Sequence, residues 1–79
     1  MSDKRTEAEQ IVTNVIREQL CIEDFSLDAK FGEEIRADSL EIVEMMIVAE
    51  ERVGKEIPST RSLTVKTPRE MAALLEEYL

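Results

Sequence analysis

The chain has 79 residues, 43% of them hydrophobic but only three aromatic, so it has the length of one small domain with an aliphatic core. Its 18 acidic and 10 basic residues give a net charge of −8, which argues against nucleic acid and anionic membranes as partners and favours a basic protein. The absence of histidine and the single cysteine exclude a disulfide framework, histidine-based catalytic dyads and most zinc sites.

The first predicted element is a helix over residues 6–20, where apolar residues recur at spacings of three and four. Thr6 and Glu9 have the spacing of a capping box at its start. Cys21 follows, and we expect a buried or half-buried thiol without a function. No apolar run has the length of a membrane span and no secretory signal is recognisable, so we expect a cytoplasmic protein.

A long connection over residues 21–38 separates this helix from the next. Connections of this length inside a small domain are usually functional. Four apolar residues are spread along it, and we expect them to hold the loop against the helices: Phe25, Leu27, Phe31 and Ile35.

The second predicted helix covers residues 39–53 and ends at Gly54, a typical helix stop. A short helical turn is expected within residues 59–66. Thr67, Pro68 and Glu70 then match a helix start with a threonine cap, a proline in the first turn and a capping box. These elements predict an all-α fold, a four-helix bundle of three main helices and one short helix, with residues 1–79 as a single domain.

The second helix carries two apolar stripes. One stripe is the expected core face: Ile42, Met45, Met46, Ala49 and Val53. The other stripe is edged by Glu44, Glu50 and Glu51 and consists of Leu40, Val43 and Ile47. The periodicity fits equally well a docking surface for a partner and a helix that is buried on two sides.

Charge is distributed unevenly around this helix. Residues 33–51 contain seven acidic residues and one basic residue, a net charge of −6, whereas residues 55–69 have a net charge of +3. At the expected helix start, either Asp38 or Ser39 is a plain cap. Ser39 is alternatively a phosphate attachment point, because a helix N-terminus offers free N–H groups and a positive dipole end. Without a histidine to activate it, Ser39 is not expected to be a catalytic nucleophile.

The chain resembles the acyl carrier proteins at this point. Asp38-Ser39-Leu40 matches the Asp-Ser-Leu signature of that family, and the resemblance continues through an acidic helix to Gly54 and then Ile57-Pro58. It covers essentially the whole chain. The tripeptide alone is a weak signal, but its combination with the acidic helix, Ile-Pro and the total length is specific.

The resemblance implies a non-catalytic carrier. The serine, here Ser39, would receive 4′-phosphopantetheine from coenzyme A by the action of a separate phosphopantetheinyl transferase, and the thiol of the arm would carry acyl groups as thioesters. Asp38 would assist recognition by the transferase. Positions that contact acyl-processing enzymes with basic docking patches in the family correspond to Leu40, Glu41, Val43, Glu44, Ile47 and Glu51. The carrier would act as a monomer.

Two departures from the family pattern bear on the pathway. Arg36 stands where the family usually has glycine, and the usually acidic segment after Pro58 reads Ser59-Thr60-Arg61-Ser62 here. The carrier would therefore serve either fatty acid synthesis or a specialised polyketide, lipid or aminoacyl pathway. The alternative function is a small acidic helical adaptor that binds a basic partner without covalent modification.

Overall fold

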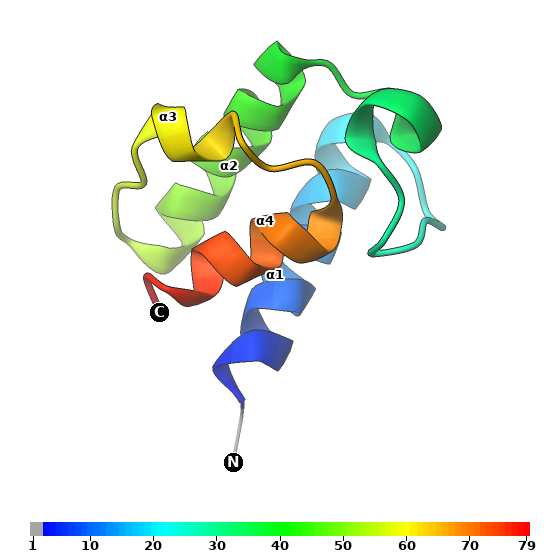
Figure 1. The fold of residues 1–79 in the computed structure, drawn as a ribbon. Helices are drawn as coiled ribbons and strands as arrows, with labels where there is room; N and C mark the ends of the chain where they lie inside the picture. Colours follow the sequence, from blue (N-terminus) through cyan, green and yellow to red (C-terminus); the bar gives the residue numbers. More distant parts are fainter. Residues whose placement is uncertain (1–2) are drawn as a thin grey trace.

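The computed structural model describes residues 3–79, and this part of the chain is helical with long connections (Figure 1). The predicted all-α bundle of three main helices and one short helix is confirmed, and a π-helical turn is added within the long loop. In chain order the elements are α1 (Lys4–Leu20), η1 (Phe31–Ile35), α2 (Ser39–Val53), α3 (Ser59–Ser62) and α4 (Pro68–Glu76).

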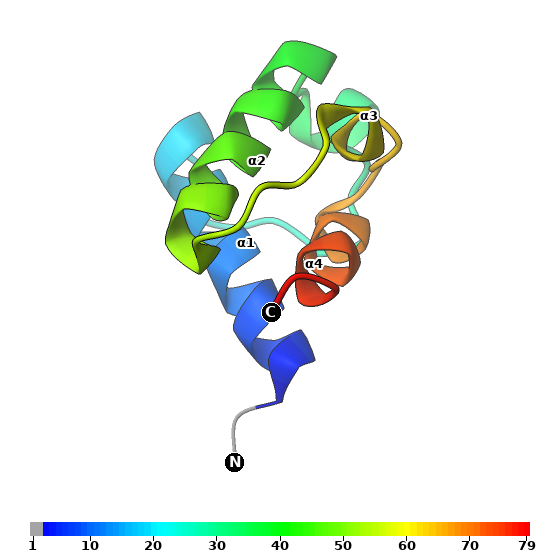
Figure 2. The same ribbon diagram turned by 90° about the vertical axis from the view of Figure 1, so that its left-hand side faces the viewer.

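The core lies where α1, α2 and α4 meet, since α1 contacts both other long helices. α3 closes the bundle between α2 and α4, and Figure 2 shows it across from α2, with the 54–58 segment running between them. Within residues 3–79, no helix is both long and apolar enough to cross a bilayer. The largest side chains that are almost wholly buried in this core are mostly aliphatic or methionine: Phe31, Ile16, Met45, Met46, Met71 and Leu75.

The start of α1 differs from the prediction. The helix begins at Lys4, and the Asp3 carboxylate caps it by accepting a hydrogen bond from the Arg5 backbone N–H at 3.0 Å. Thr6 therefore lies inside the first turn, and its predicted role as a cap was wrong. At the other end, Cys21 adopts a left-handed conformation with φ 55° and is exposed. The expected burial of its thiol was also wrong, because the helix ends at this residue in the left-handed conformation and leaves the side chain exposed.

The second helix has the predicted bounds, with a defined cap at each end. The Asp38 carboxylate accepts a hydrogen bond from the Glu41 backbone N–H at 2.8 Å, and the Glu41 carboxylate accepts one from the Asp38 N–H at 3.1 Å. This reciprocal pair is a capping box. Gly54 ends the helix with φ 73°, a conformation that costs glycine little.

The long loop is held by Phe31, whose side chain is only 1% exposed. Its backbone N–H donates to the Lys66 carbonyl at 2.9 Å, and its own carbonyl accepts from Ala37 at 2.7 Å. Arg36, with φ 64° and ψ 39°, ends η1 in the left-handed region. The expectation that apolar loop residues hold the loop to the helices is confirmed for Phe31, with Phe25 and Ile35 also packed against the core.

The last helix has the predicted threonine cap and the predicted proline in its first turn. The Thr67 hydroxyl accepts from the Glu70 N–H at 3.1 Å, and Pro68 occupies the first turn. The predicted capping box is incomplete, however, because the Glu70 carboxylate accepts from Lys66, one residue before the cap, at 3.1 Å. The cap therefore also fixes the end of the connection from α3.

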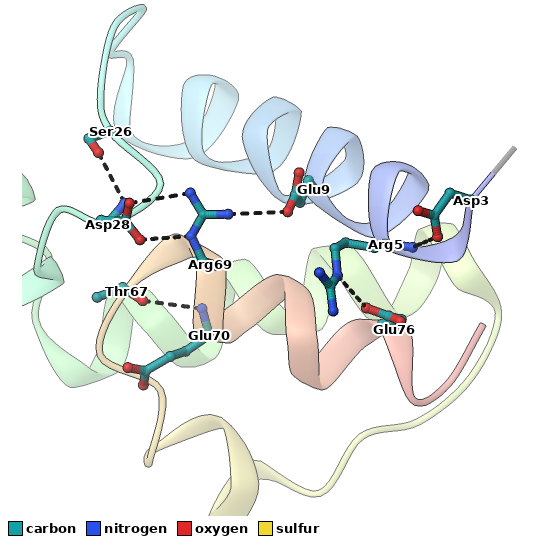
Figure 3. A network of polar contacts seen from close by, with 9 residues as sticks. All are labelled: Asp3, Arg5, Glu9, Ser26, Asp28, Thr67, Arg69, Glu70 and Glu76. Atoms are coloured by element: carbon teal, nitrogen blue, oxygen red, sulfur yellow. Dashed lines mark hydrogen bonds and ion pairs between the residues drawn. The ribbon is translucent and has the colours of Figure 1, made fainter.

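An arginine on α4 joins the long loop to α1 and α4 (Figure 3). The Arg69 Nε and Nη2 atoms donate to the two carboxylate oxygens of Asp28 at 2.7 and 3.2 Å. The Arg69 Nη1 lies 3.5 Å from a Glu9 oxygen, and the Arg69 backbone N–H donates to Leu27 at 2.8 Å. The hydrogen bonds from Arg69 hold the pKa of Asp28 below its ordinary value of 3.8. This segment of the loop is thus attached to the bundle by polar contacts at the surface.

Arg36→Gly is expected to raise the free energy of unfolding by about 0.5–1 kcal/mol. An L residue in the left-handed region costs about 1–2 kcal/mol, and the greater freedom of glycine in the unfolded chain offsets about 0.4–1 kcal/mol of that gain. Urea denaturation measures the change. Arg36→Ala is the matched control, since it removes the charge and keeps the Cβ. Equal midpoints for the two variants would contradict the explanation from backbone strain.

Arg69→Gln is expected to raise the pKa of Asp28 toward 3.8, which the carboxyl ¹³C shift measures during an NMR pH titration. Since the folded-state pKa is depressed, the pair contributes stability above the ordinary pKa, and this contribution is lost as the pH falls through the folded-state value. The control is Arg5→Gln, which removes an arginine that pairs with Glu76 instead. An Asp28 titration that is the same in wild type and Arg69→Gln would refute the assignment.

Candidate functional site

Ser39 is the first residue of α2 and is exposed. The capping box places Asp38, rather than Ser39, in the role of the helix cap. The carboxylate of Asp38, beside the serine, thus supplies the side-chain cap of α2. The fold does not require the serine hydroxyl as a cap. The sequence left open whether Asp38 or Ser39 is the cap, and the structure assigns this role to Asp38.

A groove of about 380 Å³ opens beside Ser39. Its walls come from four parts of the chain: the loop with η1, the first turn of α2, Leu63 after α3, and the connection to α4. Its lining includes Lys30 and Lys66, and Leu63 is 56% exposed. No pattern in the sequence placed these three residues near Ser39, because they are distant along the chain and only the long-range fold brings them together.

The two stripes of α2 have different environments. On the core face Met45, Met46 and Ala49 are at most 1% exposed, and Ile42 is 9% exposed, as predicted. On the second stripe Leu40 is 65% and Ile47 is 47% exposed. Val43 lies between these extremes as a half-buried residue. The helix is therefore not buried on both sides, and the second stripe leaves two large apolar side chains in contact with solvent.

The acidic residues beside this stripe divide into two groups. Glu44 and Glu51 are exposed. Glu41 and Glu50 have structural contacts: Glu41 completes the capping box of α2, and the Glu50 carboxylate accepts a hydrogen bond from the Ile57 backbone N–H at 3.0 Å. Glu50 thereby attaches the segment before α3 to α2.

A second groove, of about 390 Å³, lies between α2 and the segment that leads into α3. The half-buried Val43 and the exposed Ile47 form part of its α2 wall, with the buried Met46 beneath. Ile57 and Ser62, both buried, line the opposite side. One edge of the exposed stripe thus continues into a partly apolar depression, whose lining also includes Glu50 and Glu56.

Comparison with known proteins assigns this arrangement to a family. The sequence profile of the family described as "Phosphopantetheine attachment site" matches residues 10–75. This match includes the long loop, α2 with its two stripes, and α3.

Several relatives carry the name acyl carrier protein. The protein from Akkermansia muciniphila is 33% identical over 79 residues, which cover 98% of this chain and 96% of the relative. The proteins from Helicobacter hepaticus and Bdellovibrio bacteriovorus are 33% and 35% identical, over 82% and 84% of this chain and 88% and 87% of their own lengths. No solved structure matches the chain.

Both kinds of similarity extend over most of the chain, and they do not favour the alternative of an unmodified adaptor. The chain belongs to the acyl carrier protein family, whose members are non-catalytic carriers of acyl groups on a covalently attached 4′-phosphopantetheine arm.

Proposed function

We propose that the 4′-phosphopantetheine arm is attached to Ser39. This proposal is supported by one observation at the start of α2: the Asp38 carboxylate caps the helix, and the adjacent serine is exposed. A transferase can therefore reach the hydroxyl without breaking a cap hydrogen bond. Asp38 would add a carboxylate beside the hydroxyl as a feature that the transferase recognises.

The residues around Ser39 fit such an arm. The first turn of a helix has free N–H groups and a positive dipole end, which favour a phosphate, and the groove beside Ser39 is open. When attached, the arm supplies the thiol that carries an acyl group as a thioester. The chain itself provides the attachment hydroxyl and the surface on which enzymes approach it.

The same proposal assigns the exposed stripe of α2 to enzyme docking. Leu40 and Ile47 would supply apolar contact, with Val43 at the edge of the depression toward α3. Glu44 and Glu51 would steer enzymes with basic patches, since charges at the rim of an interface act mainly on the rate of encounter. Glu41 is a weaker candidate for direct contact, because its carboxylate is already bonded within the capping box.

The partners in this proposal are a phosphopantetheinyl transferase and acyl-processing enzymes of fatty acid, polyketide or specialised lipid synthesis. The depression between α2 and α3 is lined partly by apolar side chains, which include Val43, Ile47 and Ile57, and it lies next to the docking stripe. It would therefore be a suitable place for a carried acyl chain. We place this carrier, as one domain of residues 1–79, in the cytoplasm. It would act as a monomer, which leaves Leu40 and Ile47 free for successive enzymes.

Ser39→Ala is expected to abolish the gain in intact mass when the apo protein is incubated with coenzyme A and a broad-specificity transferase. The helical circular dichroism should be unchanged, because Asp38 supplies the cap. Ser59→Ala is the matched control, since Ser59 is also an exposed serine at the first position of a helix. Retained modification of the Ser39→Ala protein would disprove the assignment.

Ile47→Ala is expected to change the free energy of unfolding by no more than about 0.5 kcal/mol, because this side chain is 47% exposed. It should nevertheless lower the catalytic efficiency of an acyl-processing enzyme toward the holo protein. Ile42→Ala, on the core face of the same helix, should destabilise the fold by about 2–5 kcal/mol. Urea denaturation and steady-state kinetics measure the two effects. Equal destabilisation by both substitutions would contradict the assignment of Ile47 to docking.

A further inference from the structure

Two lysines from distant parts of the sequence line the groove beside Ser39. Lys30 directly precedes η1, and Lys66 lies in the connection between α3 and α4. Their presence is unexpected next to the most acidic segment of a chain with a net charge of −8. The signature around Ser39 accounts for neither lysine.

The backbone of Phe31 holds these lysines near each other and near the start of α2. Its N–H donates to the Lys66 carbonyl at 2.9 Å, so residues 30–31 run beside residue 66. Its carbonyl accepts from the Ala37 N–H at 2.7 Å, two residues before Ser39. Since the Phe31 ring is buried, these two backbone hydrogen bonds are anchored to the core.

The ammonium groups of both lysines are available for an anionic ligand. The Lys30 Nζ lies 3.9 Å from a Glu33 oxygen, and both side chains are largely exposed, so this pair is easily exchanged. None of the six ion pairs found within residues 3–79 involves Lys66. The other carboxylate that lines the groove belongs to Asp38, and it accepts the cap hydrogen bond from the Glu41 backbone N–H.

We propose that Lys30 and Lys66 bind the phosphodiester of the arm attached to Ser39 and so hold the first part of the arm in this groove. The inference rests on the proposed attachment to Ser39. A phosphodiester on the serine oxygen carries one negative charge at neutral pH and lies at the edge of the groove. Lysine is a common phosphate ligand, and its flexible stem lets the ammonium follow the phosphate. The apolar part of the arm beyond the phosphate would then contact Leu63.

The test uses the holo protein, prepared with coenzyme A and a transferase and verified by its intact mass. The ³¹P resonance of the phosphodiester and the heteronuclear NOE of ¹⁵N-labelled pantetheine amides are measured at low and high salt. In the wild type we expect a ³¹P shift that changes with salt and a restrained amide next to the phosphate. In the double variant Lys30→Gln/Lys66→Gln, both the salt response and the restraint should be lost. Lys55→Gln is the control, because this lysine does not line the groove.

The outcomes separate this proposal from the assignment of Ser39. If no mass is gained, or if Ser39→Ala is still modified, the attachment to Ser39 is overturned and this proposal is overturned with it. If the holo double variant keeps the wild-type ³¹P response and amide NOE, the lysines do not bind the phosphodiester. A slower modification reaction together with unchanged holo spectra would also overturn the proposal, because the lysines would then act on the transferase or on coenzyme A.

Discussion

The position of Ser39 depends on the burial of Phe31. Fixing a long loop costs conformational entropy at every residue, and this cost must be offset by contacts that the loop makes. Phe31 provides the most buried of these contacts, and its backbone hydrogen bonds connect the loop to residue 66 on one side and to residue 37 on the other. Because residue 37 leads directly into the cap of α2, the buried ring also fixes the direction from which the chain enters that helix.

Features that depend on neighbouring residues could be predicted from the sequence. The bounds of α2 follow from Gly54 at its end and from a cap at its start, and both are local signals. The core face of α2 follows from periodicity, because the spacing of Ile42, Met45 and Met46 matches one side of a helix. The start of α1 was misplaced because Thr6 and Asp3 both have suitable side chains, and the sequence alone does not show which of them meets the free N–H groups.

Features that depend on long-range packing could not be predicted. The π-helical turn is too short for a periodic signal, and it is fixed by the burial of Phe31 and by Arg36 in the left-handed region. The difference from the family pattern at Arg36 was apparent in the sequence, but the sequence did not show that this residue lies in the left-handed region. The groove beside Ser39 likewise depends on a backbone hydrogen bond that holds Lys66 next to the loop.

Ser39 stands between two surfaces that differ in their charged residues. One is the outward face of α2, where Glu44 and Glu51 flank exposed apolar side chains. The other is the groove, whose lining contains Lys30 and Lys66 together with Glu33 and Asp38. Charges interact strongly only within about 8 Å at physiological ionic strength, so each surface acts mainly on what lies next to it. In the proposed function, the two lysines would attract an anionic group on the serine, and the acidic face would repel it. In the same proposal, the arm would begin on the groove side of the helix start and leave the acidic face free for basic enzymes.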